Sequence, residues 1–313
     1  MSRTLIIGAC GQLGSELTVY LRNRKGNDQV IASDISNPIP YISDGPFEKL
    51  NIMDKDRFLQ LIKEYDISEV YHLAAVLSAK GEQNPLFAWQ LNMDSLLLVL
   101  EAAKDGLIKK IYWPSSIAVF GPDTPKDQTP QNTIMNPNTV YGISKQAGER
   151  WCQYYFEKYG VDVRSIRYPG LIGYKTKPGG GTTDYAVDIF FKATEHQHFD
   201  CFLEEDTELP MMYMDDAVRA TVELMEAPTD SIKVRSSYNL AAISFTPAQI
   251  FQEIKKHFPD FNISYTPDFR QTIADSWPNS INDQAAAQDW GWKHRFDLSS
   301  MVDEILSQMV ESI

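Results

Sequence analysis

The sequence predicts an α/β protein, in which a doubly wound parallel sheet is followed by a smaller lobe. Two observations predict this class. Short apolar runs alternate with longer amphipathic segments over roughly the first 170 residues, a pattern typical of parallel strands joined by crossover helices. After Gly170 the chain changes to a glycine-rich loop, "KTKPGGGTTDYA", and to shorter elements. We expect one domain over 1–170 and mainly a second lobe over 171–313, with some segments of the lobe returning to the first domain.

The expected elements of the first domain follow one another in regular order. Strands are predicted at "TLIIG" (4–8), "QVIASD" (29–34), "VYHLAA" (70–75), "KKIYWPSS" (109–116) and "VDVRSIRYPG" (161–170). Helices are predicted over 12–24, 85–106 and 141–160, and the last two end at Gly106 and Gly160, since glycine commonly ends a helix.

Composition and charge limit the classes of partner. The chain has 313 residues, a hydrophobic share of 43% and a charged share of 23%, as in ordinary globular proteins. Its net charge of −13 argues against nucleic acid and anionic membranes, because phosphate binding requires clustered Lys and Arg. A neutral, zwitterionic or cationic small molecule fits this charge better.

The spacing of the cysteines and the first residues of the chain indicate the cellular compartment of the protein. Cys10, Cys152 and Cys201 lie far apart without CxxC spacing, which favours a reducing compartment over disulfides or a zinc site. The chain opens directly on a strand-like run and has no apolar run of membrane-spanning length. We therefore expect a cytoplasmic protein, although a leader that had been removed would leave no trace. No metal is expected, because the five histidines show no ligand spacing.

A glycine-rich turn lies between the first strand and the first helix. "GACGQLG" places Gly8, Gly11 and Gly14 in a GxxGxxG pattern. Glycines let the backbone approach a pyrophosphate, and the helix N-terminus offers free N–H groups and a positive dipole end. This context predicts dinucleotide binding; the alternative is a tight turn without a ligand.

Asp34 ends the second predicted strand, twenty residues beyond Gly14. A carboxylate at this position accepts hydrogen bonds from the ribose hydroxyls of an adenosine and repels a 2′-phosphate. No Arg or Lys follows in "DISNP" to bind that phosphate. The cofactor predicted is therefore NAD rather than NADP.

Four residues form a candidate catalytic group. Ser115 and Ser116 follow a strand, and Tyr141 and Lys145 lie four positions apart on a predicted helix, so they share one face. Hydride transfer from an alcohol requires removal of the hydroxyl proton. The Lys145 ammonium and an oxidised nicotinamide are both expected to lower the pKa of Tyr141, which then acts as the base, while Ser116 holds the substrate oxygen.

Together these motifs resemble the extended short-chain dehydrogenase/reductase family, the group of the UDP-galactose epimerases and nucleotide-sugar dehydratases. The resemblance rests on GxxGxxG, "HLAA" (72–75), "SSIAVFG" (115–121) and YxxxK, and extends to "YNLAAISFTPAQI" (238–250) and "GWKHRFDLSSMVDEI" (291–305). It implies a Rossmann domain, NAD, and a homodimer formed through the long helices after Gly81 and Tyr141. One departure is Asn51, where the family often has an aspartate near the adenine.

The resemblance also implies the residues that contact the cofactor. They run from the glycine-rich turn to the strand after the Tyr141 helix: Gly8, Gly11, Gln12, Leu13, Gly14, Asp34, Asn51, Ile52, Leu73, Ala74, Ala75, Asn92, Ser115, Tyr141, Lys145, Tyr168 and Pro169.

Two further segments narrow the substrate. "GGGTTDYAVDIFF" (179–191) and "DSWPNSINDQAAAQDWGW" (275–292) are similar to the short-chain type of L-threonine 3-dehydrogenase. That resemblance implies L-threonine as substrate, oxidised at its β-hydroxyl to 2-amino-3-oxobutanoate, with Ser78, Thr182, Thr183 and Trp277 as binding residues beside Ser116 and Tyr141. Trp277 has the alternative of a purely packing role.

Two other functions remain open. A nucleotide-sugar epimerase or dehydratase shares the scaffold, but those enzymes usually place a basic residue where this chain reads "EEDTELPMMYMDD", and no Arg or Lys lies between Lys192 and Arg219. A non-catalytic NAD-binding protein is less favoured, because Tyr141 and Lys145 are both present.

Overall fold

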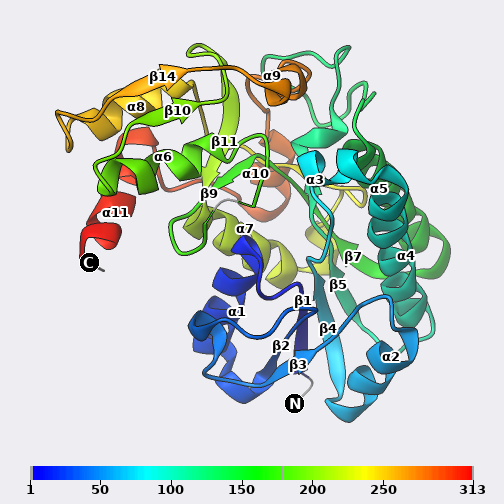
Figure 1. Ribbon diagram of the computed structural model, residues 1–313. Helices are drawn as coiled ribbons and strands as arrows, with labels where there is room; N and C mark the ends of the chain where they lie inside the picture. The colour runs from blue at the N-terminus through cyan, green and yellow to red at the C-terminus, as the bar shows by residue number, and fades with distance from the viewer. Residues whose placement is uncertain (1–2, 178, 312–313) are drawn as a thin grey trace.

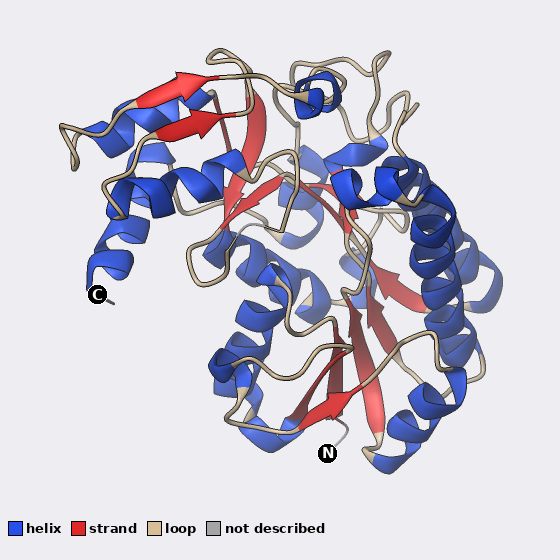
Figure 2. Cartoon of the chain, in the orientation of Figure 1, coloured by secondary structure: helices blue, strands red, loops and turns tan. Residues whose placement is uncertain are grey.

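A six-stranded parallel sheet forms the centre of the first domain (Figures 1 and 2). The structure is a computed structural model that describes residues 3–177 and 179–311. The strand order is β3 (Phe47–Lys49), β2 (Val30–Asp34), β1 (Arg3–Ile7), β4 (Ile67–His72), β5 (Lys110–Tyr112) and β7 (Asp162–Arg164). The order reverses between β1 and β4, and such a switch point is where open parallel sheets bind ligands. The predicted α/β class is confirmed.

Helices cover both faces of this sheet, because neighbouring residues of each strand face opposite sides. Leu5 and Ile7 of β1 belong to the core under α2 (Lys55–Glu64), α4 (Pro85–Lys104) and α5 (Val140–Tyr159). Ile6 belongs to the core under α1 (Gln12–Lys25) and α7 (Met214–Glu226). Figure 1 shows α4 and α5 side by side on the outer surface of the first domain.

Two predicted strands are divided between different sheets, the first between two and the second among three. The segment 109–116 forms β5 and then β6 (Ser115–Ser116), and the segment 161–170 forms β7, β8 (Ile166–Tyr168) and the start of β9 (Gly170–Ile172). Pro114 has no N–H to donate and interrupts the first segment. At the carboxyl edge of the main sheet, β6, β8 and β12 (Tyr238–Asn239) form a separate parallel sheet. The predicted strand 70–75 ends at His72, which leaves residues 73–75 as a loop.

The second lobe consists of short strands and helices. Its remaining elements are α6 (Tyr185–Thr194), β10 (Phe199–Cys201), β11 (Leu209–Tyr213), β13 (Ile243–Phe245), α8 (Pro247–Lys255), β14 (Ile263–Tyr265), α9 (Phe269–Ala274), α10 (Gln284–Trp290) and α11 (Leu298–Glu311). The short helix α3 (Ser78–Gln83) precedes α4. A domain boundary at residue 170 stays a prediction, and α7 packs on α1 in the first domain.

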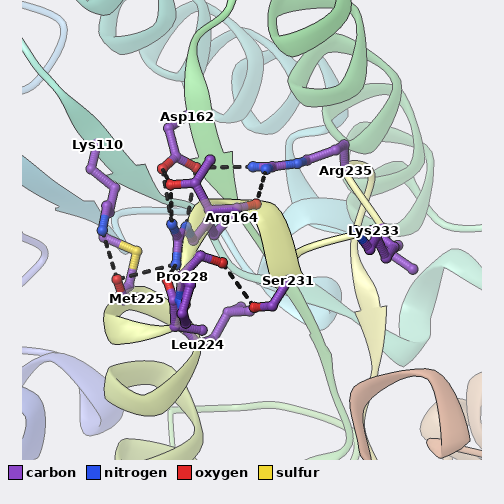
Figure 3. A network of polar contacts seen from close by, with 12 residues as sticks. Lys110, Asp162, Arg164, Leu224, Met225, Pro228, Ser231, Lys233 and Arg235 are labelled. Carbon is purple, nitrogen blue, oxygen red and sulfur yellow. Dashed lines mark hydrogen bonds and ion pairs between the residues drawn. The ribbon is translucent and has the colours of Figure 1, made fainter. Parts of the chain in front are cut away.

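A buried polar network fixes α7 to the main sheet (Figure 3). Arg164 of β7 donates through Nη1 to the carbonyl oxygens of Leu224, Met225 and Ala227 at distances of 2.6, 3.2 and 2.7 Å. Asp162 pairs with the same guanidinium at 2.9 Å. A helix C-terminus carries partial negative charge and unpaired carbonyls, which a cation satisfies. A segment beyond residue 170 is thereby part of the cofactor-binding half of the molecule. Within the described residues, no helix is long and apolar enough to cross a membrane.

Candidate active site

The glycine-rich turn fits a pyrophosphate. Gly8 has φ +87°, and a Cβ there would lie 2.8 Å from the Ala74 nitrogen; a Cβ at Gly14 would lie 2.1 Å from the Gly8 oxygen. Gly11 is the N-cap of α1 and offers no side-chain acceptor to the first N–H groups of the helix. The turn therefore packs tightly against the loop after β4 and leaves a helix N-terminus available to an anion.

Asp34 lies at the carboxyl end of β2 beside this turn. Its carboxylate accepts hydrogen bonds from the N–H groups of Cys10 at 3.0 Å and Ser36 at 2.9 Å, which fix its orientation. Lys49 lies opposite Asp34 in the β2–β3 register and donates to Asn37 Oδ1 at 3.3 Å. Sequence reasoning missed this cation, because it comes from a neighbouring strand and not from the residues after Asp34.

A cavity of about 560 Å³ runs from the glycine-rich turn into the second lobe. It brings together most of the predicted site residues: Gly8, Gly11, Gln12, Leu13, Gly14, Leu73, Ala75, Ser78, Ser115, Ser116, Tyr141, Lys145, Tyr168, Pro169, Thr182, Thr183 and Trp277. The cavity thus joins the predicted cofactor, catalytic and substrate groups in one continuous site.

Five predicted cofactor residues, Asp34, Asn51, Ile52, Ala74 and Asn92, are not among the cavity-lining residues. Asn51 accepts a hydrogen bond from the Met53 N–H at 3.1 Å, and the side chain of Ile52 is buried in the core. Contacts of these two residues with the adenine stay predictions.

Asn92 supports the site from behind. Its side chain exchanges hydrogen bonds with the backbone of Val76, at 2.8 and 3.1 Å, and donates to Ser144 Oγ at 3.1 Å. Ser144 in turn donates to the carbonyl oxygen of Tyr141 at 2.7 Å. Asn92 therefore connects the loop after β4 to the start of α5, and a direct contact between Asn92 and the cofactor stays a prediction.

Two glycines allow α5 to pack closely against the segment 113–119, which contains Ser115 and Ser116. A Cβ at Gly142 would lie 2.1 Å from the Ala118 oxygen, and a Cβ at Gly148 would lie 2.3 Å from the Trp113 ring. The side chain of Thr139 caps the helix by accepting a hydrogen bond from the Gly142 N–H at 3.1 Å. This close packing places Tyr141 within hydrogen-bonding reach of Ser116.

Burial governs the protonation of the catalytic pair. It raises the pKa of Tyr141 to about 12, although the hydrogen bond from Ser116 acts to lower it. Burial also lowers the pKa of Lys145 to about 7, while Cys152 and Glu149 act to raise it. Lys145 Nζ donates to the Pro114 oxygen at 2.6 Å and lies 5.5 Å from the centre of the Tyr141 ring. The pKa of Tyr141 is thus set by burial, which raises it, and by Ser116, which lowers it, and the predicted lowering by Lys145 is not found among the protein groups that act on it.

The predicted substrate residues come from three separate segments. A Cβ at Gly170 would lie 2.8 Å from Thr183 Cβ. The absence of a side chain at Gly170 therefore allows the loop that contains Thr182 and Thr183 to approach β9. Thr182 is 1% exposed, and its Oγ1 has no hydrogen-bond partner among the described residues. Trp277 is 5% exposed and both packs in the core of the second lobe and lines the cavity.

The cavity also contains residues that sequence reasoning missed. Lys80 and Lys177 line it, and so does Asp184, whose carboxylate accepts hydrogen bonds from the N–H groups of Gly180 and Gly181, both at 2.7 Å. Asp184 could have been predicted from its position directly after the two threonines. No sequence pattern marks Lys80 or Lys177 as a site residue. Over residues 3–177 and 179–311, no group of three His, Cys, Asp or Glu side chains is arranged to hold a metal ion.

A sequence model of the NAD dependent epimerase/dehydratase family matches residues 4–241. The chain belongs to this family. The resemblance to the extended short-chain dehydrogenases/reductases is thereby confirmed, and NAD is the cofactor. With the catalytic pair in the same cavity, the chain is an NAD-dependent oxidoreductase.

Solved structures and curated relatives agree on the family and differ in their names. The chain is 54% identical to "GalE-like L-Threonine dehydrogenase from Cupriavidus necator (holo form)", with a TM-score of 0.95 and coverage of 98% and 99% of the two chains. It is 50% identical to a "Monomeric L-threonine 3-dehydrogenase from metagenome database", with a TM-score of 0.95 and coverage of 99% of each chain. A relative from Staphylococcus saprophyticus, named only as an uncharacterized epimerase/dehydratase, is 48% identical over 98% of this chain and 96% of its own.

The first prediction concerns cofactor choice. Asp34→Ala is expected to weaken NAD binding and to reduce the preference for NAD over NADP by about 10- to 100-fold, because it removes a carboxylate facing the 2′-phosphate and leaves Lys49 beside it. Dissociation constants for both cofactors, measured by calorimetry, test this. Asp34→Ala with Lys49→Ala is the control that should lose the gained NADP affinity. Equal affinities in the unaltered protein would contradict the assignment of Asp34.

The second prediction concerns the base. Tyr141→Phe is expected to lower kcat by at least about 10²-fold without weakening NAD binding, since it removes only the ionisable oxygen. Lys145→Met is expected to move the rising limb of the pH–rate profile to higher pH, because an ammonium favours the phenolate and its loss raises the phenol pKa. NADH formation and calorimetry measure the two quantities. An unchanged kcat in Tyr141→Phe would rule out Tyr141 as the base.

Proposed function

We propose that the protein oxidises L-threonine at its β-hydroxyl to 2-amino-3-oxobutanoate. The observation that supports this most strongly is one cavity that combines Tyr141 and Ser116 with the ring of Trp277 and the buried hydroxyl of Thr182, which has no partner in the described part of the chain. A buried hydroxyl without a partner costs about 1–3 kcal/mol, so a polar ligand group is expected beside it. The solved L-threonine dehydrogenases that cover the whole chain support the same substrate.

The residues have separate roles in the proposed reaction. Ser116 orients the β-hydroxyl of the substrate beside Tyr141 by a hydrogen bond. Tyr141 accepts the hydroxyl proton as the carbon–hydrogen bond breaks, and NAD supplies the acceptor for the hydride. Lys145 holds a positive charge on the same helix face and thereby favours the phenolate of Tyr141. The products are the ketone, the reduced cofactor and one proton.

The ammonium and carboxylate of threonine require charged or polar partners. The hydroxyls of Ser78, Thr182 and Thr183 are proposed as carboxylate donors, and Trp277 limits the size of the pocket and excludes water. Lys80 and Lys177 add positive charge to the cavity wall, which suits a carboxylate and also a sugar diphosphate. The family match and the name of the staphylococcal relative keep the epimerase reaction as the second candidate.

A panel of substrates tests the proposal. We expect NADH formation with L-threonine, none with D-threonine, and a kcat/KM about 10- to 200-fold lower with L-serine, because a lost methyl contact costs roughly 1–3 kcal/mol. Thr183→Ala and Trp277→Ala should each raise the KM for threonine more than that for NAD. Thr194→Ala is the matched control, since its hydroxyl donates only to helix carbonyls. Conversion of a UDP- or GDP-sugar with the cofactor retained, and no NADH from threonine, would establish the epimerase instead.

We also propose a homodimer through α4 and α5. Large apolar side chains are exposed along these two helices: Leu86, Phe87 and Trp89 on α4, and Ile143, Trp151, Tyr154 and Tyr159 on α5. Leu86 is 83% exposed, and large apolar side chains exposed on two neighbouring helices favour a protein interface there.

Sedimentation measures the assembly directly. The unaltered protein is expected to sediment as a dimer and Trp151→Glu as a monomer, because a charge would be buried at the contact. A monomer in the unaltered protein, as in the name of the metagenome relative, would refute the dimer.

A further inference from the structure

A second charged pair lies directly behind the catalytic residues. Glu149 is one helical turn beyond Lys145 on α5 and is fully buried. Arg167 donates to both of its carboxylate oxygens, through Nε at 2.8 Å and Nη2 at 2.7 Å. Ser115 donates to Glu149 Oε1 at 2.6 Å. The carboxylate therefore has three donors and no contact with solvent.

This pair joins the strands that carry the site. Ser115 of β6 pairs in register with Arg167 of β8, and the next residues in the same register are Ser116 and Tyr168, which line the cavity. Because Glu149 binds both Ser115 and Arg167, one carboxylate on α5 fixes two strands relative to the catalytic helix. The position of Ser116 beside Tyr141 follows from that fixation.

Arg167 extends the connection to the second lobe. Its Nη1 donates to the Gln131 oxygen at 3.0 Å and to Asn239 Oδ1 at 2.9 Å. Asn239 Nδ2 in turn donates to the carbonyl oxygens of Thr129 and Asn282. Asn282 lies five residues beyond Trp277, so the network connects Glu149 to the segment that carries this cavity-lining residue.

Glu149 differs from the other titratable groups near Lys145 because it is held in an ion pair. The groups that influence Lys145 from its own helix are Cys152 and Glu149, both of which act to raise its pKa, and His72 of β4 is close enough for Lys145 to affect its titration. Burial lowers the pKa of His72 to about 3, so the imidazole is neutral and adds no charge. The Cys152 thiol is also neutral at physiological pH, since burial raises its pKa well above the usual value. The pKa of the Tyr141 phenol is also raised by burial, and the remaining group that acts on Lys145 is Glu149, which is ion-paired with Arg167 at 2.7 Å.

We propose that Glu149 is a positioning residue of the Tyr141–Lys145 pair: anchored by Arg167 and Ser115, it supplies the buried negative charge that keeps Lys145 an ammonium and fixes the strand carrying Ser116. This inference rests on the proposed roles of Tyr141 and Lys145 and adds a residue that touches neither substrate nor cofactor. A buried ion pair seldom adds stability over apolar residues of the same shape, so stability alone gives little reason for one here.

The proposal predicts that the pKa of Lys145 falls when the charge of Glu149 is removed. Glu149→Gln keeps the size of the side chain and removes the charge, so the Lys145 titration midpoint should fall by about one pH unit. From a pKa of about 7, such a fall reduces the protonated fraction at pH 7 from about half to about a tenth. Activity near pH 7 should therefore fall about fivefold from the charge alone, and the falling limb of the pH–rate profile should move to lower pH.

The direct test is a titration of Lys145 followed by ¹³C NMR. The full chain, labelled at the lysine ε-carbon and saturated with NAD, is titrated without substrate, and Lys145→Met identifies the resonance. Glu149→Gln is compared with Glu157→Gln, a matched control that removes the same charge from the exposed side of the same helix. The exposed charge is screened by water, so Glu157→Gln should leave the midpoint unchanged.

Two more variants distinguish the effect of the Glu149 charge from its effect on the position of the strand and from a loss of stability. Ser115→Ala keeps the carboxylate and removes one anchor, so kcat should fall while the midpoint stays close to that of the unaltered protein. Glu149→Gln combined with Arg167→Gln leaves no unpaired buried charge and is expected to be more stable to heat than Glu149→Gln alone. Its Lys145 midpoint should still lie below that of the unaltered protein, because Glu149 is the nearer charge on the same helix.

An unchanged Lys145 midpoint in Glu149→Gln, or an equal fall in Glu157→Gln, would overturn the inference. So would a uniform loss of activity at every pH, which is the result expected of a purely structural pair. Because the titration uses no substrate, its result stands whether or not L-threonine proves to be the substrate. Failure of the substrate panel and failure of this inference are therefore separate outcomes.

Discussion

The close contact between α5 and the segment 113–119 is the constraint on which the site depends. Gly142 and Gly148 have no Cβ, so the helix approaches the Ala118 oxygen and the Trp113 ring at distances that any side chain would prevent. That approach sets Tyr141 beside Ser116 and buries Lys145 against the Pro114 carbonyl. A side chain at either glycine would move the helix outward and separate a base from the hydroxyl that it must reach.

The same closeness creates an electrostatic difficulty. Burial penalises the charged form of both catalytic groups, so the pKa of Tyr141 rises and that of Lys145 falls, each away from the ion needed for proton transfer. In the proposed site, an oxidised nicotinamide would favour the Tyr141 phenolate, and Glu149 would favour the Lys145 ammonium. A tightly packed site of this kind requires both, because water is excluded and cannot stabilise either ion.

Local patterns in the sequence predicted five of the six strands of the main sheet, all but β3, and the glycine-rich turn, because strand–helix periodicity and the spacing of Gly8, Gly11 and Gly14 are short-range features. They did not predict that 109–116 and 161–170 divide between sheets, since β6 pairs with β8 and β8 pairs with β12, which joins segments from three distant parts of the chain. Most predicted site residues share one cavity. Lys49, Glu149 and Arg167 were missed because their relation to Asp34 and Lys145 depends on strand register and side-chain packing.

Net charge is a poor guide to what this cavity binds. The chain carries a charge of −13, and the segment between Lys192 and Arg219 is without Lys or Arg. Yet the fold brings Lys80, Lys145 and Lys177 from three different segments to one cavity. A carboxylate and a diphosphate are both attracted to lysines, so charge alone does not distinguish an amino acid from a nucleotide sugar. Trp277 is nearly fully buried in the second-lobe core and also lines the cavity, so its ring is a fixed part of the cavity surface, and the proposal of an amino-acid substrate depends on this packing rather than on charge.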